Sequence, residues 1–166
     1  MRLLNKIGLL AIISLCGCAN YNVQQSGTTS KTLQASYPVY VVLSAGNYLQ
    51  QNQQVQAAFE KALSKRGVSV FAGETRLRES AAFALAQRLK RGYVLYPEVT
   101  KWEDHNTPWS TIRDKVNISV KVIEMGSGRL ISQNVLEGKS TFWTMKNTAP
   151  DVIFPGLVSQ YVGTLY

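Results

Sequence analysis

The sequence predicts a single α/β domain over residues 37–166, with three parallel strands and two crossover helices, then an antiparallel hairpin and a C-terminal helix. Up to about residue 100, short apolar runs of strand length alternate with segments whose apolar residues recur at helical spacing. Beyond residue 115, apolar and polar residues alternate strictly, which is typical of strands with one face in water. About 150 residues follow the leader, enough for one domain with a real core.

The first half reads as strand, helix, strand, helix, strand. The run 37–44 is continuously apolar, as in strands buried on both faces, and tolerates Pro38 at its start. A helix is predicted over 49–66, its glutamines facing solvent and Gly67 ending it. A short strand at 68–72, a second helix ending at Gly92 and a strand at 93–99 follow. This order predicts parallel pairing of the three strands.

The second half begins after a polar loop. Residues 116–122 alternate between apolar and polar, and 130–139 is the predicted hairpin partner across a glycine-containing turn. The last residues return to helical spacing, which predicts a C-terminal helix with Asp151 near its N-terminus and Pro155 in its first turns.

The leader, residues 1–17, has the layout of a secretory signal peptide. Arg2 and Lys6 precede the apolar run 7–13, which is too short to span a membrane. The stretch ending in Gly17-Cys18 resembles the lipobox of bacterial lipoproteins, whereas Leu15 before Cys16 does not fit the small-residue position. The resemblance implies that Cys18 is acylated, with palmitate-type chains, and becomes the first mature residue. Residues 18–36 are then expected to be the lipid anchor and a flexible tether.

Ala19 follows the proposed anchor. In bacterial lipoproteins an aspartate at this position commonly retains the protein at the inner membrane. The resemblance therefore implies a lipid-anchored protein of the outer membrane, with its body in the periplasm and its membrane contact made through Cys18.

Composition and charge narrow the partners. The full chain has 18 Lys and Arg; two of them leave with the leader, so 16 basic residues face 10 acidic ones and the formal net charge is +6. Basic clusters at 65–66, 76–78 and 88–91 either favour acidic partners or complement helix C-termini. Export and the lack of a recognition motif argue against nucleic acid. Neither cysteine belongs to the body, so no disulfide or thiolate metal site is expected.

Motifs for a cofactor fail on inspection. The triplet 138–140 reads Gly-Lys-Ser, but the earlier glycine of a phosphate-binding loop would fall at Gln133. Glycines 126 and 128 fit a hairpin turn better than a phosphate site, because no helix follows them. His105, beside Glu103 and Asp104, invites a metal or acid–base interpretation, but consecutive side chains splay apart. No cofactor and no metal are therefore predicted.

The segment after the third strand holds the candidate partner-binding residues. Its two tryptophans either pack as lids over the end of the sheet or offer exposed anchors to a partner. The candidates are Trp102, Glu103, Asp104, Trp109 and Arg113.

The chain also resembles a family of bacterial lipoproteins, domain of unknown function 4823. The resemblance rests on Tyr96-Pro97, Trp102-Glu103-Asp104, Trp109-Ser110 with Asp114, Gly138-Lys139-Ser140 and Pro150-Asp151. It covers most of the chain after residue 36 and implies no enzyme activity, because the family has none assigned. His105 and Pro108 stand where the family's central motif has an arginine and an acidic residue, which puts the role of those positions in doubt.

Two functional hypotheses follow. The first is a non-catalytic accessory lipoprotein that docks an envelope protein or a peptidoglycan-related partner, since the order of elements is similar to that of periplasmic lipoprotein modules assisting envelope machines. The alternative is a small-ligand-binding or hydrolytic protein whose site lies in the loop after the third strand, with Glu103, Asp104, His105 and Arg113.

Overall fold

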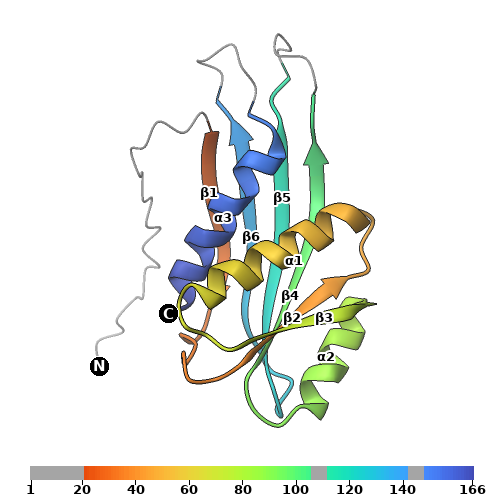
Figure 1. Ribbon diagram of the computed structural model, residues 1–166, viewed down its shortest axis with the longest axis vertical. Helices are drawn as coiled ribbons and strands as arrows, with labels where there is room; N and C mark the ends of the chain where they lie inside the picture. Colours follow the sequence, from red (N-terminus) through yellow and green to blue (C-terminus); the bar gives the residue numbers. More distant parts are fainter. Residues whose placement is uncertain (1–20, 106–111, 142–147) are drawn as a thin grey trace, which may run out of the picture.

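The computed structural model describes residues 21–105, 112–141 and 148–166 as a six-stranded sheet with three helices (Figure 1), which confirms the mixed α/β class. The sheet order is β1-β6-β5-β4-β2-β3. The strands are β1 Tyr21–Thr29, β2 Val39–Ser44, β3 Val70–Leu77, β4 Tyr93–Glu103, β5 Lys115–Glu124 and β6 Leu130–Ser140. The helices are α1 Leu49–Ser64, α2 Glu79–Arg88 and α3 Pro150–Leu165.

The sheet is parallel at one side and antiparallel at the other. Strand β2 pairs in parallel with both β3 and β4. Strands β4, β5, β6 and β1 then pair antiparallel in that order. Strands β2, β3 and β4 therefore run in the same direction. Strands β4 and β6 extend to the upper end of the molecule in Figure 1.

The prediction that residues 18–36 form a flexible tether is wrong for Tyr21–Thr29, because these residues form strand β1. They pair with β6 from Tyr21 opposite Ser140 to Thr29 opposite Ser132. The Thr29 and Ser132 hydroxyls lie 2.9 Å apart. An uncharged polar segment gives no apolar alternation, yet it satisfies the backbone groups of β6. The folded body thus includes residues well before position 37.

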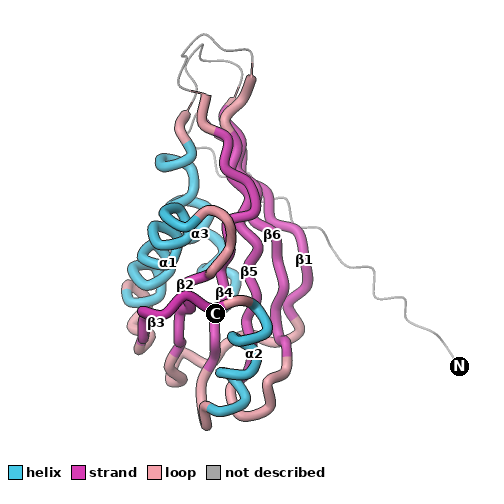
Figure 2. The backbone as a smooth tube through the Cα atoms, turned by 90° about the vertical axis from the view of Figure 1, so that its right-hand side faces the viewer, coloured by secondary structure: helices cyan, strands magenta, loops and turns pink. Residues whose placement is uncertain are grey.

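The two faces of the sheet are covered unequally. Helices α1 and α3 lie side by side on one face, over a core that includes Phe59, Leu95 and Leu157 (Figures 1 and 2). Helix α2 covers the other face beside β4, over a small cluster around Val94 and Ala86. In the described part of the chain, the rest of that second face, on β1, β6 and most of β5, has no covering helix and is mainly polar.

One of the five glutamines of α1 departs from the expectation that they face solvent, because it is buried; the other four are exposed or half-buried. Gln56 is buried and donates from Nε2 to the carbonyls of Val41, at 3.0 Å, and Gly73, at 2.8 Å. The β2–β3 register shifts between these points. Asn52 accepts from the Val99 N–H at 2.7 Å, next to a similar irregularity between β4 and β5. Strand irregularities leave backbone groups unpaired, and these two side chains satisfy them.

Element ends differ from expectation mainly in length. Strand β3 runs to Leu77 and β4 to Glu103, several residues beyond the predicted ends. Helix α3 begins as predicted, with Asp151 in its first turn and Pro155 inside it. Within the described ranges, no helix is long and apolar enough to cross a membrane.

Candidate partner-binding site

The predicted site lies at the upper end of the sheet, where β4 ends at Glu103 and β5 begins at Lys115 (Figure 1). Of the candidate residues, Trp102, Glu103, Asp104 and Arg113 fall within the described ranges, whereas Trp109 lies outside them.

Trp102 packs inward. Its side chain is half-buried against the main core, and its ring centroid lies 5.7 Å from that of Phe154 in α3. Trp102 stands opposite Val116 of β5, on the helix-covered face. This position matches the first of the two alternatives for the tryptophans, a lid over the end of the sheet.

Glu103 points to the uncovered face instead. Its carboxylate lies 3.0 Å from Lys101 Nζ and 3.6 Å from Lys115 Nζ. The hydrogen bond from Lys101 lowers the pKa of Glu103, as do the charges of Lys101, Lys115 and His105. The surroundings of Glu103 therefore favour its charged form, and two neighbouring ammonium groups balance that charge.

Asp114 is the buried carboxylate of this end, with an exposed fraction of 2%. One of its oxygens accepts the His105 backbone N–H at 2.7 Å and lies 3.3 Å from His105 Nδ1. Its own N–H donates to Ser140 Oγ at 3.1 Å, and the Ser140 N–H donates to the Asp114 carbonyl at 3.0 Å. These bonds tie the base of the β4–β5 connection to the end of β6.

Asp104 and Arg113 are exposed beside this network, and so is the Ile112 side chain, at 55%. The structure thus brings His105 to Asp114 and Glu103 to two lysines. In the described part of the chain, no three His, Cys, Asp or Glu side chains gather closely enough to hold a metal ion.

Sequence reasoning missed Asp114 as the partner of His105 and Ser140 as the partner of Asp114, and it missed the charged ladder on the uncovered face. Lys115 of β5 lies on that face, and Glu137 and Lys139 pair there at 3.5 Å on β6, whereas Lys121 forms an ion pair with Glu79 of α2 on the part that α2 covers. The polar half of the alternation over 115–121 carries the signal for this ladder, but only the strand register shows which residues meet.

The model of the family described as a domain of unknown function, DUF4823, matches residues 29–165. The chain belongs to the DUF4823 family. No curated protein matches it.

Several solved structures share the fold of this DUF4823 protein. PelC of Paraburkholderia phytofirmans, a dodecamer, superposes with a TM-score of 0.60 and 18% identity over 87% of this chain and 97% of PelC. Protein XCC0632 of Xanthomonas campestris, from family DUF330, superposes with a TM-score of 0.51 and 11% identity, over 84% of this chain and 90% of XCC0632. A minor lipoprotein of Acinetobacter baumannii has a TM-score of 0.46 and 13% identity, over 80% of this chain and 92% of the lipoprotein. At these identities the likeness to PelC and to XCC0632 shows the fold alone, and the lower TM-score of the minor lipoprotein supports no conclusion.

Proposed function

We propose that this DUF4823 protein is a lipid-anchored, non-catalytic accessory module of the bacterial cell envelope that docks another envelope component. The lipobox-like stretch before Cys18 supports the anchor, and Ala19 supports an outer-membrane location with the body in the periplasm. The partner is an envelope protein or a peptidoglycan-related component.

The observation that carries this proposal is the start of β1 at Tyr21, opposite Ser140. Only three residue steps separate Cys18 from Tyr21, so an extended chain reaches at most about 11 Å. Such a short connection would hold the upper end of the sheet beside the membrane. The lipid would then fix the orientation of the body, whereas a long tether would leave it free to rotate.

The exposed side chains at this anchored end are the proposed contacts with a membrane-associated partner. Asp104→Lys and Arg113→Glu should lower recovery of the partner by affinity purification of the lipidated protein after crosslinking in cells. Trp102→Ala should lower stability by about 2 kcal/mol, since the ring packs against Phe154. If the parent chain, Asp104→Lys and Arg113→Glu recovered equal amounts of the partner, the anchored end would not be the contact surface.

The outer-membrane location has its own test. Ala19→Asp should move the lipidated protein to the inner-membrane fraction on a density gradient, with fatty-acid labelling unchanged. An unchanged distribution would contradict the sorting proposal and leave the anchor proposal standing.

Self-assembly is a specific form of docking to be measured first. PelC, which shares the fold, is a dodecamer. Analytical ultracentrifugation of the lipidated protein in detergent would show whether the docked component is a second copy of this chain.

The second candidate function is a small-ligand or hydrolytic site, which the His105–Asp114 pair favours. A carboxylate beside Nδ1 leaves Nε2 to bind a ligand or proton. A thermal-shift screen with divalent metals, sugars and peptidoglycan fragments tests it, because a ligand at a hundredfold excess over its Kd stabilises by about 2.7 kcal/mol. His105→Ala should abolish any such shift if this site is the one occupied.

A further inference from the structure

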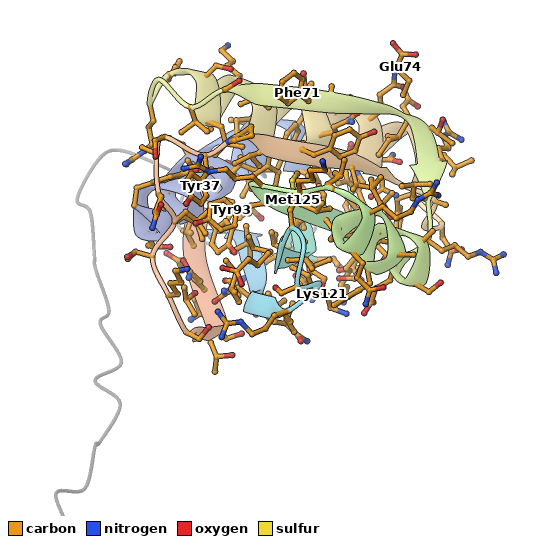
Figure 3. All side chains as sticks on the ribbon, turned by 90° about the horizontal axis from the view of Figure 1, so that it is seen from below. Tyr37, Phe71, Glu74, Tyr93, Lys121 and Met125 are labelled. Carbon is orange, nitrogen blue, oxygen red and sulfur yellow. The ribbon has the colours of Figure 1, made fainter. Side chains whose placement is uncertain are left out.

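Two of the three basic clusters of the sequence, 65–66 and 88–91, lie with Lys31 and Arg129 at one end of the molecule, opposite the anchored end. Backbone hydrogen bonds join the segments there: Tyr93 N–H to Pro38, Met125 N–H to Gly92 and Val39 N–H to Ser69. Figure 3 views the molecule from this side. We call it the basic end; its cations are Lys31, Arg129, the pair 65–66 and the trio at 88, 90 and 91.

The net positive charge of the described residues resides at the basic end. Seven of the 16 basic residues from Cys18 onward lie there, and only one of the ten acidic residues, Glu124. The difference is +6. The other described residues include eight basic and nine acidic side chains, a net charge of −1, and Lys146 lies outside the described ranges. An even distribution would place about half of the net positive charge at each end, so the molecule carries a strong charge asymmetry along its long axis.

Helix dipoles account for a minor share of this charge. All three helices end near this side, and each C-terminus carries roughly half a negative charge. Together they offset about 1.5 of the six positive charges. Complementing helix ends therefore leaves most of the excess charge unexplained.

Most of these cations also lack an acidic partner. Glu124 lies 3.1 Å from Lys31 and 3.3 Å from Arg129. Within the described ranges, no carboxylate forms an ion pair with the other five cations of the basic end, and all seven side chains are exposed. The field of this end is thus directed to solvent.

One arginine is held in position by aromatic rings. The Arg91 guanidinium lies 4.3 Å from the centroid of the Tyr37 ring, and Tyr37 packs against Tyr93 at 5.9 Å (Figure 3). The Tyr93 hydroxyl accepts the Gln34 N–H at 3.2 Å. A stacked guanidinium keeps its N–H edge free for a carboxylate, and arginine with tyrosine is typical of protein interfaces.

The membrane that holds the anchor is too far away to be the ligand. Ten residue steps along β6, from Leu130 to Ser140, span about 33 Å. The Debye length at physiological salt is about 8 Å, so anionic headgroups beside the anchored end are screened from the basic end.

We propose that the basic end binds an acidic surface of a periplasmic protein, with Arg91 and the neighbouring cations pairing with its carboxylates. This inference rests on the proposed anchor for its direction, and it names a second contact surface, distinct from the anchored end.

The test is crosslinking in living cells from the full lipidated chain. A photoreactive phenylalanine analogue replaces exposed Ser69 at the basic end or, as control, exposed Gln53 near the start of α1. The Ser69 position should give a discrete protein adduct whose crosslinked peptide is rich in Asp and Glu, and Gln53 should not. Arg88→Glu with Lys90→Glu should reduce the adduct at least tenfold. Arg76→Glu with Arg78→Glu, the same change in charge at the other end of α2, should leave it within twofold.

Restoration completes the test. Replacing the crosslinked acidic residues of the captured protein by lysine should restore the adduct with the Arg88→Glu, Lys90→Glu chain. Adducts with phospholipid only, no adduct, or an adduct insensitive to the charge reversal would overturn the proposal. Fatty-acid labelling of the same variants reports separately on the anchor: loss of the adduct with labelling intact concerns the basic end alone.

Discussion

A single amide, Gln56, joins helix α1 to two strands at the place where their pairing is irregular. Its Nε2 serves two carbonyls, Val41 and Gly73, that the shifted β2–β3 register leaves near one another. Removing this buried donor leaves both carbonyls without a hydrogen bond. That loss costs more free energy than the hydrogen bond contributes when it is present. The residue is therefore part of the core in spite of its polarity.

Gln56→Ala should lower the free energy of unfolding by about 2 kcal/mol, because two buried carbonyls lose their donor. Gln53→Ala, an exposed change on the same helix, should stay within about 0.5 kcal/mol of the parent. Urea titrations of the body followed by circular dichroism measure both. Equal effects at the two positions would show that Gln56 contributes only helix propensity.

Tyrosine ionisation should make the fold sensitive to alkali. Burial raises the pKa of Tyr166 to about 12, and burial also raises the pKa of Tyr161 and Tyr96. Because the folded pKa lies above the unfolded value near 10, this stability is present below pH 10 and is lost as pH rises toward 12. Urea midpoints should fall steadily between pH 9 and pH 11.5.

Tyr166→Phe measures the contribution of Tyr166 to this loss of stability at alkaline pH. Among the described residues the Tyr166 hydroxyl has no hydrogen-bond partner, so its removal should not lower stability at pH 7. The variant should also lose less stability than the parent between pH 9 and pH 11.5. A variant that is less stable at neutral pH would indicate a partner for the hydroxyl.

At the scale of elements, β1 decides the extent of the domain. It is an edge strand of nine residues without a charged side chain, and its hold on β6 includes contacts between residues more than 100 positions apart. Gly27 lies in its middle with φ of 144°, and an added Cβ would collide with the Gln133 carbonyl. Only glycine adopts this backbone conformation without strain.

Gly27→Ala should therefore detach β1 while the rest of the sheet remains folded. Hydrogen exchange measured by mass spectrometry should show lost protection over residues 21–29 and along β6, with β2 and β4 unchanged. Ser26→Ala, on the exposed side of the same strand, is the matched control and should keep full protection. Protection of β1 retained in Gly27→Ala would show that the strand tolerates the strain.

For the whole molecule, the start of β1, which follows the proposed anchor in the chain, and the basic end lie at opposite ends of the sheet. The orientation of these two ends relative to the membrane depends on lipid attachment at Cys18, three residues before β1. That attachment would orient an asymmetric charge distribution away from the membrane, where it attracts acidic partners by long-range steering.

Cys18→Ser should abolish labelling by a fatty acid and leave the leader uncleaved, because serine lacks the thiol that receives the lipid. Cys16→Ser should change neither step. Metabolic labelling and membrane fractionation of both variants beside the parent measure this. Label lost in Cys16→Ser but kept in Cys18→Ser would move the anchor by two residues, and a parent without label would remove the lipid anchor altogether.

The sequence by itself determined the α/β class, the family resemblance and most elements from β2 to α3. Periodicity is a local property: the run at 39–43, the helical spacing in α1 and the alternation in β5 each hold their signal within a few residues. The candidate end of the sheet was also predictable, since loops after strands carry exposed polar residues.

The tertiary structure alone decided β1, the buried amides of α1, the His105–Asp114–Ser140 contacts and the gathering of the cations of the basic end. Each depends on which distant segments pair, and none leaves a periodic trace. From the sequence, the polar strand β1 cannot be distinguished from a linker, because its pairing with β6 is visible only in the structure. Likewise, Gln56 resembles a surface residue in the sequence, and only the structure shows its hydrogen bonds to two strand carbonyls. The cations of the basic end come from parts of the chain 20 or more positions apart, namely Lys31, 65–66, 88–91 and Arg129, and the order of strands and helices places them together.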